Sequence, residues 1–390
     1  MKKSNFAILM AMVMASGPFA VDAYLPGIPT MAEFLGTGID AVATTVSFYI
    51  FGMALGQLIG GPMADKFDKR NLIIIGLLLY AASSLVIATA TSLAVIQIAR
   101  VFQAIGGGFS IVCIAPLVRM RETGNEAAKL FSLIALIMVI APAIAPTIGA
   151  LILLVGNWQT IFYFTAAYSV FVALLVWRSL PKSPVTTQPA AVAVHKRYLE
   201  VMKNKTAMRY LAVQACGYSV MMVFVTNSSL IYQHHFGLSE QMFGLVFAAN
   251  TLVNVAVNRL NSYLLNSIPA SKLLQIAILI QAVFVAALIV LTATDAPVSV
   301  YVLGIMGAVG MLGAIPPNSN SLFISQYSEN TGAASALLGS AQFVAASLAG
   351  GLSTLMYNGT LWPPVLTMTA LVVLSNLFLP RAASSKLQTA

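Results

Sequence analysis

Charged side chains are the first thing that this sequence has little of. Only 8% of its 390 residues are Asp, Glu, Lys or Arg, whereas 59% are hydrophobic. Soluble domains carry about 25% charged residues, so this chain cannot cover a surface that faces water on all sides. Its apolar runs are about 20 residues long, which is the length of a membrane-spanning helix and about twice that of the alternating segments in an outer-membrane barrel. The composition predicts an all-α integral membrane protein.

Cysteine and the usual enzyme motifs are scarce as well. Cys113 and Cys216 are the only cysteines, and neither has metal-ligand or disulfide spacing around it. The sequence contains no P-loop Gly-Lys-Ser/Thr pattern, no HExxH metal motif and no GxSxG nucleophile elbow. We therefore expect no ATP motor in this chain, no enzyme activity, no metal and no cofactor.

Twelve apolar segments are long enough to cross a bilayer. They cover residues 6–28, 40–62, 72–91, 95–118, 129–155, 159–180, 207–234, 240–264, 271–292, 297–321, 333–356 and 361–380. A polar connection with three prolines and a basic cluster separates the first six from the last six. The sequence thus predicts an N-terminal half over 1–180, a cytoplasmic linker over 181–206 and a C-terminal half over 207–390.

The basic residues indicate which side of the membrane each connection faces. If the amino end is cytoplasmic, all of the 20 basic residues except Arg100 and Arg259 fall in connections on the cytoplasmic side. This distribution accounts for the net charge of +9 without a nucleic-acid-binding patch. It also favours a retained first helix over a cleaved signal peptide, because cleavage would reverse every later connection. We expect a multi-pass protein of the bacterial cytoplasmic membrane with both termini in the cytoplasm.

Two ionisable residues lie well within the predicted spans. Arg100 falls inside the fourth, where a lipid-facing arginine costs on the order of 3 kcal/mol, so it needs a wet cavity or a carboxylate. Asp22 is the one acidic residue, of 11, that lies clearly inside a span, and it shares a depth with Arg100. We predict that the two form the ionisable centre of a transporter, with Asp22 as the proton carrier. The alternative is that Asp22 lies among headgroups while Arg100 snorkels independently.

The loop after the second span carries a recognisable pattern. Residues 61–70 resemble the signature loop of the major facilitator superfamily, with Asp68 in place of its second glycine. The matching residues are Gly61, Asp65, Lys66, Lys69 and Arg70. The resemblance implies a latch that joins two halves of a transporter on the cytoplasmic side in the outward-open state, with Asp65 as the latch acid. A solvated charged loop is the alternative.

Two further motifs resemble those of proton-coupled members of this superfamily. Residues 100–106 match a fourth-helix pattern of arginine, glutamine and small residues, and residues 141–150 are similar to the antiporter motif, of which Pro142, Pro146 and Gly149 remain. The prolines weaken helix hydrogen bonding and favour a bend. Together with Asp22-Ala23-Tyr24-Leu25-Pro26, these motifs resemble the drug:proton antiporters of the bicyclomycin and chloramphenicol resistance type. The resemblance implies a twelve-helix bundle whose two six-helix halves, related by a pseudo-two-fold axis, rock around a midplane cavity.

Polar side chains within the spans are candidates for lining that cavity, because an amide that faces lipid remains unsatisfied. They are Tyr24, Tyr49, Gln57, Gln103, Asn227, Asn250, Asn254 and Gln342. The asparagines at 250, 254 and 258 share one face of the eighth span, where they either face the cavity or bond neighbouring helices.

Glycine spacing adds two expectations about packing. Glycines at 52, 56 and 60 share a face of the second span and predict close packing against another helix. The tenth span repeats glycine at 304, 307, 310 and 313 before Pro316-Pro317, where a gate and tight packing both remain open.

The predicted function is proton-coupled efflux of small, largely apolar or cationic compounds by alternating access, driven by the proton gradient. The expected partners are a small-molecule substrate, protons and the lipid bilayer, and the protein is expected to act as a monomer. Export of one endogenous metabolite, such as a siderophore or an amino acid, is the alternative within transport. A sensor or scaffold on a transport fold is the alternative outside it, and a membrane-embedded enzyme is a remote third.

Overall fold

The computed structural model describes residues 3–122, 124–182, 194–327 and 331–380. All regular structure in these ranges is helical, and no strand is assigned in them. The side chains of a few helical residues, Asp65 among them, lie outside this description. The predicted all-α class is confirmed.

The first half of the chain forms six spans, of which two are interrupted. The first span consists of α1 (Lys3–Val21), η1 (Leu25–Gly27) and α2 (Ile28–Leu35), and the fourth of α5 (Leu93–Val112) and α6 (Ile114–Arg121). The others are α3 (Ile39–Lys66), α4 (Lys69–Thr89), α7 (Gly124–Val155) and α8 (Trp158–Ser179). The predicted end of the first span at residue 28 was too early, because the helix resumes after its break and ends at Gly36, which has a φ of 63°.

The second half also forms six spans. They are α10 (Lys205–Ser229) with the π-helical η2 (Leu230–His235), α11 (Glu240–Leu264), α12 (Ala270–Ala293), α13 (Val298–Gly310) with η3 (Met311–Gly313) and α14 (Ile315–Ile324), α15 (Thr331–Leu355), and α16 (Trp362–Phe378). The predicted linker contains a further helix, α9 (Val194–Lys203), while its residues 183–193 lie outside the described residues. The domain boundaries therefore stay a prediction.

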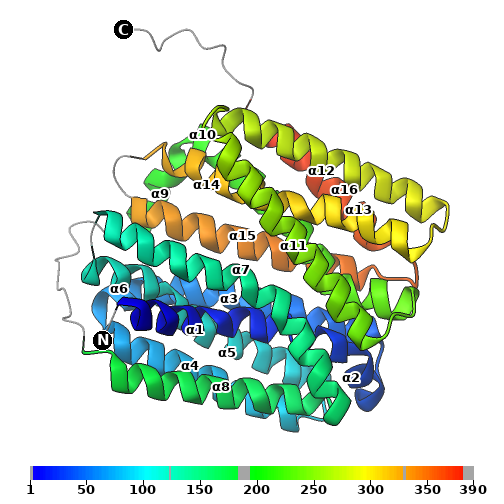
Figure 1. The fold of residues 1–390 in the computed structure, drawn as a ribbon, viewed down its shortest axis with the longest axis horizontal. Coiled ribbons are helices and arrows are strands. Elements are labelled where there is room, and N and C mark those ends of the chain that lie inside the picture. The colour runs from blue at the N-terminus through cyan, green and yellow to red at the C-terminus, as the bar shows by residue number, and fades with distance from the viewer. Residues whose placement is uncertain (1–2, 123, 183–193, 328–330, 381–390) are drawn as a thin grey trace.

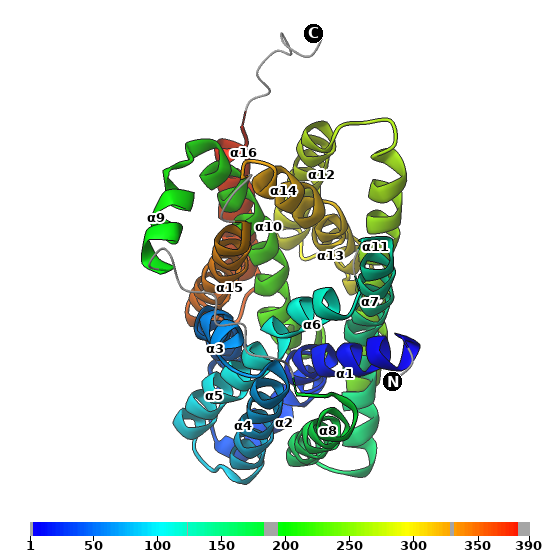
Figure 2. The ribbon, with the colours of Figure 1, turned by 90° about the vertical axis from the view of Figure 1, so that its left-hand side faces the viewer.

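The spans form two groups that follow chain order. In Figure 1 the helices α1 to α8 lie below α10 to α16, and the N-terminus lies at the left end of the bundle. Figure 2, which looks at that end, shows α3 beside α15 and α7 beside α11. The halves thus meet along two seams, and the space between the seams can hold a site that both halves share.

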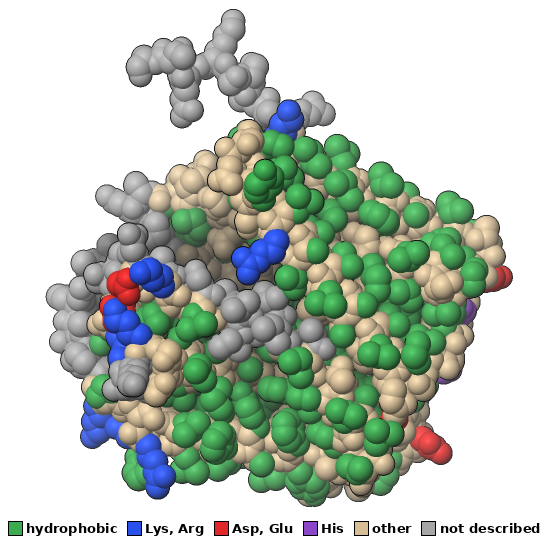
Figure 3. All heavy atoms as spheres, in the orientation of Figure 1, with side chains coloured by type: hydrophobic (Ala, Val, Ile, Leu, Met, Phe, Trp, Pro, Cys, Tyr) green, Lys and Arg blue, Asp and Glu red, His purple; other side chains and the backbone are tan. Residues whose placement is uncertain are grey.

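The two ends of the bundle differ in charge. At one end, which we call the basic end, α1 begins and α3 ends, and it carries Lys3, Lys66, Lys129, Arg178 and Lys272. Figure 3 shows Lys and Arg side chains toward this end of the visible face, whereas the opposite end shows only Asp, Glu and His. The helices are therefore arranged as the charge distribution predicts for membrane spans.

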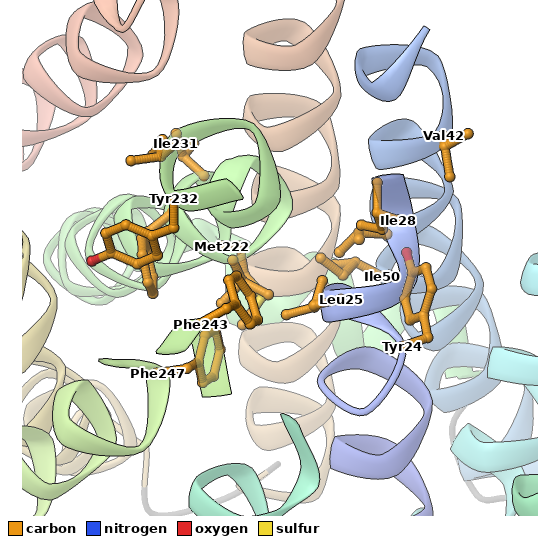
Figure 4. Packing of buried hydrophobic residues seen from close by; sticks show 14 of the residues in the cluster. Tyr24, Leu25, Ile28, Val42, Ile50, Met222, Ile231, Tyr232, Phe243 and Phe247 are labelled. Carbon is orange, nitrogen blue, oxygen red and sulfur yellow. The ribbon is translucent and has the colours of Figure 1, made fainter. Parts of the chain in front are cut away.

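One hydrophobic cluster joins the two halves at the opposite end, which we call the sealed end. Leu25 and Ile50 of the first half belong to the same cluster as Met222 and Phe243 of the second half. Figure 4 shows Leu25 of η1 beside Met222 and Phe243. Burial of large apolar side chains from both sides stabilises this closure at roughly 25 cal/mol per Å².

Hydrogen bonds reinforce the sealed end, and all three that cross between the described halves have the same direction. Ser229 Oγ donates to the Leu25 carbonyl at 2.6 Å, and Gln233 Nε2 donates to the Pro26 carbonyl at 2.9 Å. Ser347 Oγ donates to the carbonyl of Ser47 at 2.8 Å. In each case a side chain of the second half binds the backbone of the first.

At the basic end the hydrophobic clusters belong to one half each. One cluster, which includes Leu9 and Leu72, is built from first-half residues alone. The clusters around Leu274 and Phe323 are built from the second half and the adjoining α9. Figure 3 shows the surface hollowed toward this end. A hydrophobic cluster thus joins the two halves at the sealed end, whereas the described clusters of the basic end each stay within one half.

Glycines permit the closest helix contacts within each half. A Cβ on Gly56 would lie 2.8 Å from the Ile105 Cα of α5, so the predicted packing role of this glycine face is confirmed. In the tenth span, Gly313 lies against the backbone of Asn254 and Asn258 of α11. Tight packing is therefore the role that the contacts of Gly313 support.

Candidate functional site

The first span breaks at Asp22, and the local sequence explains why. After α1 ends, residues 22–24 form a turn before η1 begins. Pro26 and Pro29 have no N–H, so the carbonyls of Asp22 and Leu25 lack the donor that an α-helix supplies four residues later. The Leu25 carbonyl accepts instead from the Ile28 N–H and from a serine of the second half. Irregular backbone at membrane depth is found where it lines a cavity or is buried in protein.

Gly149 of α7 lies directly against this break. A Cβ at this position would overlap the Ala23 carbonyl oxygen and lie 2.7 Å from the carbonyl carbon. No larger side chain fits unless the chain next to Asp22 moves. The helix α7 runs through Pro142 and Pro146 without interruption. The predicted bend stays a prediction, but the close approach of Gly149 gives this motif a structural role.

Arg100 is completely buried inside the first half. Its Nη1 donates to the Ala20 carbonyl at 2.7 Å and to Gln103 Oε1 at 2.9 Å. Its guanidinium carbon lies 3.8 Å from the centre of the Tyr24 ring, and two further aromatic rings lie within 5.5 Å. The Nε and Nη2 atoms have no hydrogen-bond partner among the described residues. Aromatic faces and a carbonyl, and not a carboxylate, therefore stabilise this charge.

The predicted ion pair between Asp22 and Arg100 is not formed. No residue in the described part of the chain forms an ion pair with the Asp22 carboxylate or hydrogen-bonds to it, although the residue is only 6% exposed. The Arg100 guanidinium carbon lies 5.5 Å from the centre of the Tyr49 ring, and Val21, which precedes Asp22, packs against the cluster that contains Tyr49. The Tyr24 ring and the Ala20 carbonyl already cover the guanidinium in this conformation. The predicted role of the two residues as the ionisable centre stays a prediction.

Two aromatic residues of the second half join this cluster. Tyr218 of α10 packs against the cluster of the sealed end, which contains Ala23 and Tyr24, the two residues that follow Asp22. Tyr218 contacts Phe343 of α15 edge to face, with the ring centroids 5.4 Å apart. Phe343 also packs against the first-half cluster that contains Tyr49. Sequence reasoning missed both residues, because an aromatic residue in an apolar span gives no sign of whether it faces lipid, core or site.

The predicted cavity residues of the first half divide into two kinds. Gln103 accepts from Arg100 and donates to Ser84 Oγ at 2.7 Å, and the Tyr24 hydroxyl shares a 2.9 Å hydrogen bond with Thr45. These two support the buried arginine, and their predicted place in the lining of the cavity stays a prediction. The other two, Tyr49 and Gln57, stay candidates. The Tyr49 hydroxyl has no hydrogen-bond partner among the described residues, and Gln57 is half-buried beside Gly339 of α15.

Amides of the second half bond to one another across helices. Gln214 Nε2 donates to Gln342 Oε1 at 3.0 Å, and Ser319 Oγ donates to Gln214 Oε1 at 2.8 Å. Asn227 Nδ2 donates to Ser353 Oγ at 3.0 Å. These bonds link α10 to α14 and α15, so the candidates at 227 and 342 connect helices, whether or not they also meet a substrate.

The asparagine face of α11 has a mixed role. Asn250 donates to the Val246 carbonyl of its own helix, while its Oδ1 has no hydrogen-bond partner among the described residues. Asn254 is half-buried with its backbone against η3, and Asn258 donates to the Gly313 carbonyl at 3.0 Å. The face therefore bonds a neighbouring helix at Asn258, and the cavity-lining role of Asn250 and Asn254 stays a prediction.

The predicted latch lies at the basic end. Asp68 accepts from the Arg70 N–H at 2.9 Å and so caps α4, which explains how an acid can occupy a position where glycine is expected. The Arg70 guanidinium donates to the Trp177 carbonyl of α8, in the same half. Lys69 is buried, Gly61 is half-buried and Lys66 is exposed. Because the Asp65 side chain lies outside the described residues, the latch between halves stays a prediction.

The comparisons with known proteins agree on one family. The family model of the Major Facilitator Superfamily matches residues 7–383. A bicyclomycin resistance protein homolog of Haemophilus influenzae is 28% identical over 379 residues, which cover 96% of this chain and 95% of that protein. The multidrug resistance protein MdtL of Klebsiella pneumoniae is 27% identical over 85% of this chain and 83% of its own length.

Solved structures show the same fold. A D-xylose-proton symporter superposes with a TM-score of 0.78 at 16% identity, covering 98% of this chain and 99% of its own. The nucleoside transporter NupG superposes with a TM-score of 0.76 at 15% identity, covering 97% and 99%. At these identities the likeness concerns the fold, and it confirms the twelve-helix bundle.

Proposed function

Because the chain belongs to the major facilitator superfamily, and is therefore a multi-pass membrane transporter of small molecules and not an enzyme, we propose that it exports small, largely apolar or cationic compounds in exchange for protons. Relatives named for bicyclomycin and multidrug resistance support export of drug-like compounds. The basic end supports an orientation in which both termini face the cytoplasm of a bacterium. In that orientation the described conformation is sealed outside and open inside, and one chain, without a second copy, supplies both halves of the site.

The observation that carries this proposal is the state of Asp22. It is the only acidic residue that is buried among the described residues, it has no hydrogen-bond or ion-pair partner in them, and it lies in a helix break between the halves. A buried carboxylate without a partner gains most from binding either a proton or a cation. One group that can hold either, but not both, is what exchange of a substrate for a proton requires.

The cycle follows from this competition. Open to the cytoplasm, ionised Asp22 binds the substrate, and the halves then rock so that the sealed end opens outward. Outside, a proton displaces the substrate and neutralises Asp22, which favours return of the protein to the described conformation, where Asp22 releases the proton to the cytoplasm. Arg100 is held in place by the carbonyl of Ala20, two residues before Asp22, and by Gln103.

The available energy is sufficient for such export. When the substrate is neutral, one proton that enters through about 150 mV yields about 3.5 kcal/mol. At 1.4 kcal/mol per factor of ten, this supports a substrate gradient of about 300-fold. One carboxylate accordingly predicts one proton per cycle.

The decisive experiment compares Asp22→Asn with the unaltered protein in proteoliposomes, with chloramphenicol as a neutral probe. We expect the variant to keep chloramphenicol counterflow, which needs no energy, but to lose accumulation driven by an imposed pH gradient. Asp295→Asn is the matched control, since it makes the same change at an exposed carboxylate of the sealed end. Accumulation by Asp22→Asn at the rate of the control would refute the carrier role.

A further inference from the structure

Three side-chain hydrogen bonds reach the backbone of α1 on successive turns. The accepting carbonyls lie four residues apart, about 6 Å along the helix, and are those of Met12, Ser16 and Ala20. The first accepts from the Tyr168 hydroxyl of α8 at 2.7 Å, the second from the Tyr80 hydroxyl of α4 at 3.1 Å, and the third from Arg100 of α5 at 2.7 Å. We call these three bonds the α1 brace. They attach one helix to three others of the same half.

The α1 brace spans a weak point of its helix. Pro18 lies inside α1 and has no N–H, so the Met14 carbonyl lacks the donor that an α-helix supplies four residues later. Sharp helix kinks are usually found at such prolines. Here α1 continues past the proline to Val21, and the carbonyls of Ser16 and Ala20, on either side of the proline, both accept bonds of the brace. The brace thus supports α1 where the helix would bend most easily.

The first span has two pieces, and they are bonded to different halves. The α1 brace joins the inner piece to α4, α5 and α8 of the first half. In the outer piece, two carbonyls of η1 accept from Ser229 and Gln233 of the second half. When the halves rock, either these bonds break or the first span has to bend. The turn at residues 22–24 and the helix at Pro18 are the two places where the sequence favours a bend.

We propose that Tyr80 and Tyr168 are positioning residues for transport, because the α1 brace to which they belong prevents the first span from bending at Pro18. Bending is then confined to the turn at residues 22–24, and α1 moves as a part of the first half. A tyrosine hydroxyl inside the membrane needs a hydrogen-bond partner, but this need alone does not direct the hydroxyls of two helices to one neighbour. The inference requires the rocking of the two halves, and it makes no use of the proposed exchange for protons.

The first test is hydrogen exchange in the purified protein at a single pH, so that differences between variants report local opening. One hydrogen bond of ordinary strength changes an opening equilibrium by about fivefold. We therefore expect Tyr80→Phe, which removes only the hydroxyl, to accelerate exchange of amides 16–21 by about fivefold. Tyr168→Phe should have the same effect on amides 12–16. Exchange in α3 should stay within about twofold, because a positioning role is local.

Tyr327→Phe is the matched control for both variants. The Tyr327 hydroxyl donates to the Val201 carbonyl of α9 at 2.7 Å, which is the same kind of bond in the second half. Its loss should accelerate exchange in α9 by about fivefold and leave exchange in α1 unchanged. This result would show that exchange in α1 reports the α1 brace and not a general loosening of the bundle.

Pro18→Ala tests whether the α1 brace compensates for the proline. An alanine has an N–H that can donate to the Met14 carbonyl, so α1 then has no weak point at this position. With Pro18 present, we expect Tyr80→Phe to accelerate exchange by about fivefold, but in the Pro18→Ala background by about twofold or less.

The second test is the counterflow of chloramphenicol in proteoliposomes. We expect Tyr80→Phe to lower the maximal rate several-fold, because α1 then also bends at Pro18 and no longer follows the first half as one piece. The half-saturating concentration should stay within about twofold, since the hydroxyl binds the backbone and not the substrate. Adding Pro18→Ala should restore the rate, whereas Tyr327→Phe should not change it.

Three results would overturn the inference. They are unchanged exchange of amides 16–21 in Tyr80→Phe, equal acceleration of exchange throughout the first half, or an effect of Tyr80→Phe that is the same with and without Pro18→Ala. Absence of chloramphenicol counterflow by the unaltered protein would instead contradict the proposed substrate class, and hydrogen exchange alone would then decide the inference.

Discussion

The two halves share an architecture but differ in what they bury. The first half buries Asp22, Lys69 and Arg100, whereas the described second half buries only neutral polar side chains, such as Gln214, Asn227 and Asn261. A buried charge costs several kcal/mol unless it is compensated, and a buried amide costs little once it is bonded. The first half therefore has the buried groups that can respond to a proton, and the described second half has buried neutral groups that bond one helix to another.

The direction of the hydrogen bonds between the halves fits this division. All three that cross between the described halves are donated by second-half side chains to first-half carbonyls. Such bonds involve no charge, so they can break and form again as the halves rock without moving an ion into the membrane. Opening of the sealed end can thus be coupled to Asp22, although none of the ion pairs found among the described residues joins the two halves.

The largest expected difference between the halves concerns one arginine of each. Arg100→Met leaves the Ala20 carbonyl and the Gln103 amide without their donor inside the first half, and we expect a loss of about 3 kcal/mol of stability together with loss of transport. Arg209→Met removes an exposed guanidinium that binds carbonyls at the end of α16, for which we expect about 1 kcal/mol. Thermal unfolding in detergent measures both. Equal losses would show that the buried charge has no special role.

The next effect concerns the contact that holds the helix break. Gly149→Ala forces the chain at Ala23 to move, and overpacking of this kind costs about 2 kcal/mol. Because Asp22 adjoins Ala23, we expect gradient-driven transport to fall by more than the loss of folded protein accounts for. Gly17→Ala is the control, since a Cβ there meets nothing within 4 Å and alanine favours a helix. Transport by Gly149→Ala at the level of the Gly17→Ala control would contradict the positioning role.

A smaller effect concerns the bonds between the halves. The double variant Ser229→Ala/Gln233→Ala removes two hydrogen bonds of the sealed end, and at about 1 kcal/mol each this favours the outward-open state by about thirtyfold. Distances between spin labels on α2 and η2 would then increase. Ser228→Ala is the neighbouring control, because Ser228 Oγ donates to the Val225 carbonyl of its own helix. Unchanged distances would show that apolar packing alone closes this end.

The sequence predicts most of the scaffold because membrane spans are set by local composition. Every predicted span has a counterpart, and α11 matches its predicted bounds of 240–264. The break at Asp22 was not predicted, although Pro26 and Pro29 account for it once their missing donors are considered. The depth of a residue along the membrane normal can be read from its position in a span. Equal depth is what predicted that Asp22 and Arg100 lie in one cluster.

Rotation of a span about its own axis cannot be read from composition, and the errors at the site come from this. Tyr24 and Tyr49 were equivalent by sequence, but one lies under a guanidinium with its hydroxyl bonded and the other has an unbonded hydroxyl. The missed residues Tyr218 and Phe343 need the same information. Asp22 and Arg100 share a depth without pairing because Tyr24 lies over the guanidinium, which no spacing reveals.

The smallest expected effect concerns pH at the basic end, where Lys3 and Lys129 of the first half form ion pairs with Glu122 and Glu126. Hydrogen bonds from Lys129 and Lys3 hold the pKa of Glu126 below its usual value of 4.5. A lowered carboxylate pKa contributes stability that is present above the unfolded value and is lost as pH falls through the folded value, hence below about pH 4.5. We expect the protection of the first amides of α7 against hydrogen exchange, corrected for the intrinsic exchange rate at each pH, to fall below that pH, while the protection at the starts of α10 and α12 does not. Glu126→Gln should remove most of this difference, because a neutral amide does not titrate. An equal loss of protection against hydrogen exchange in both halves, or an unchanged difference between the halves in Glu126→Gln, would show that the ion pairs are too solvated to distinguish them.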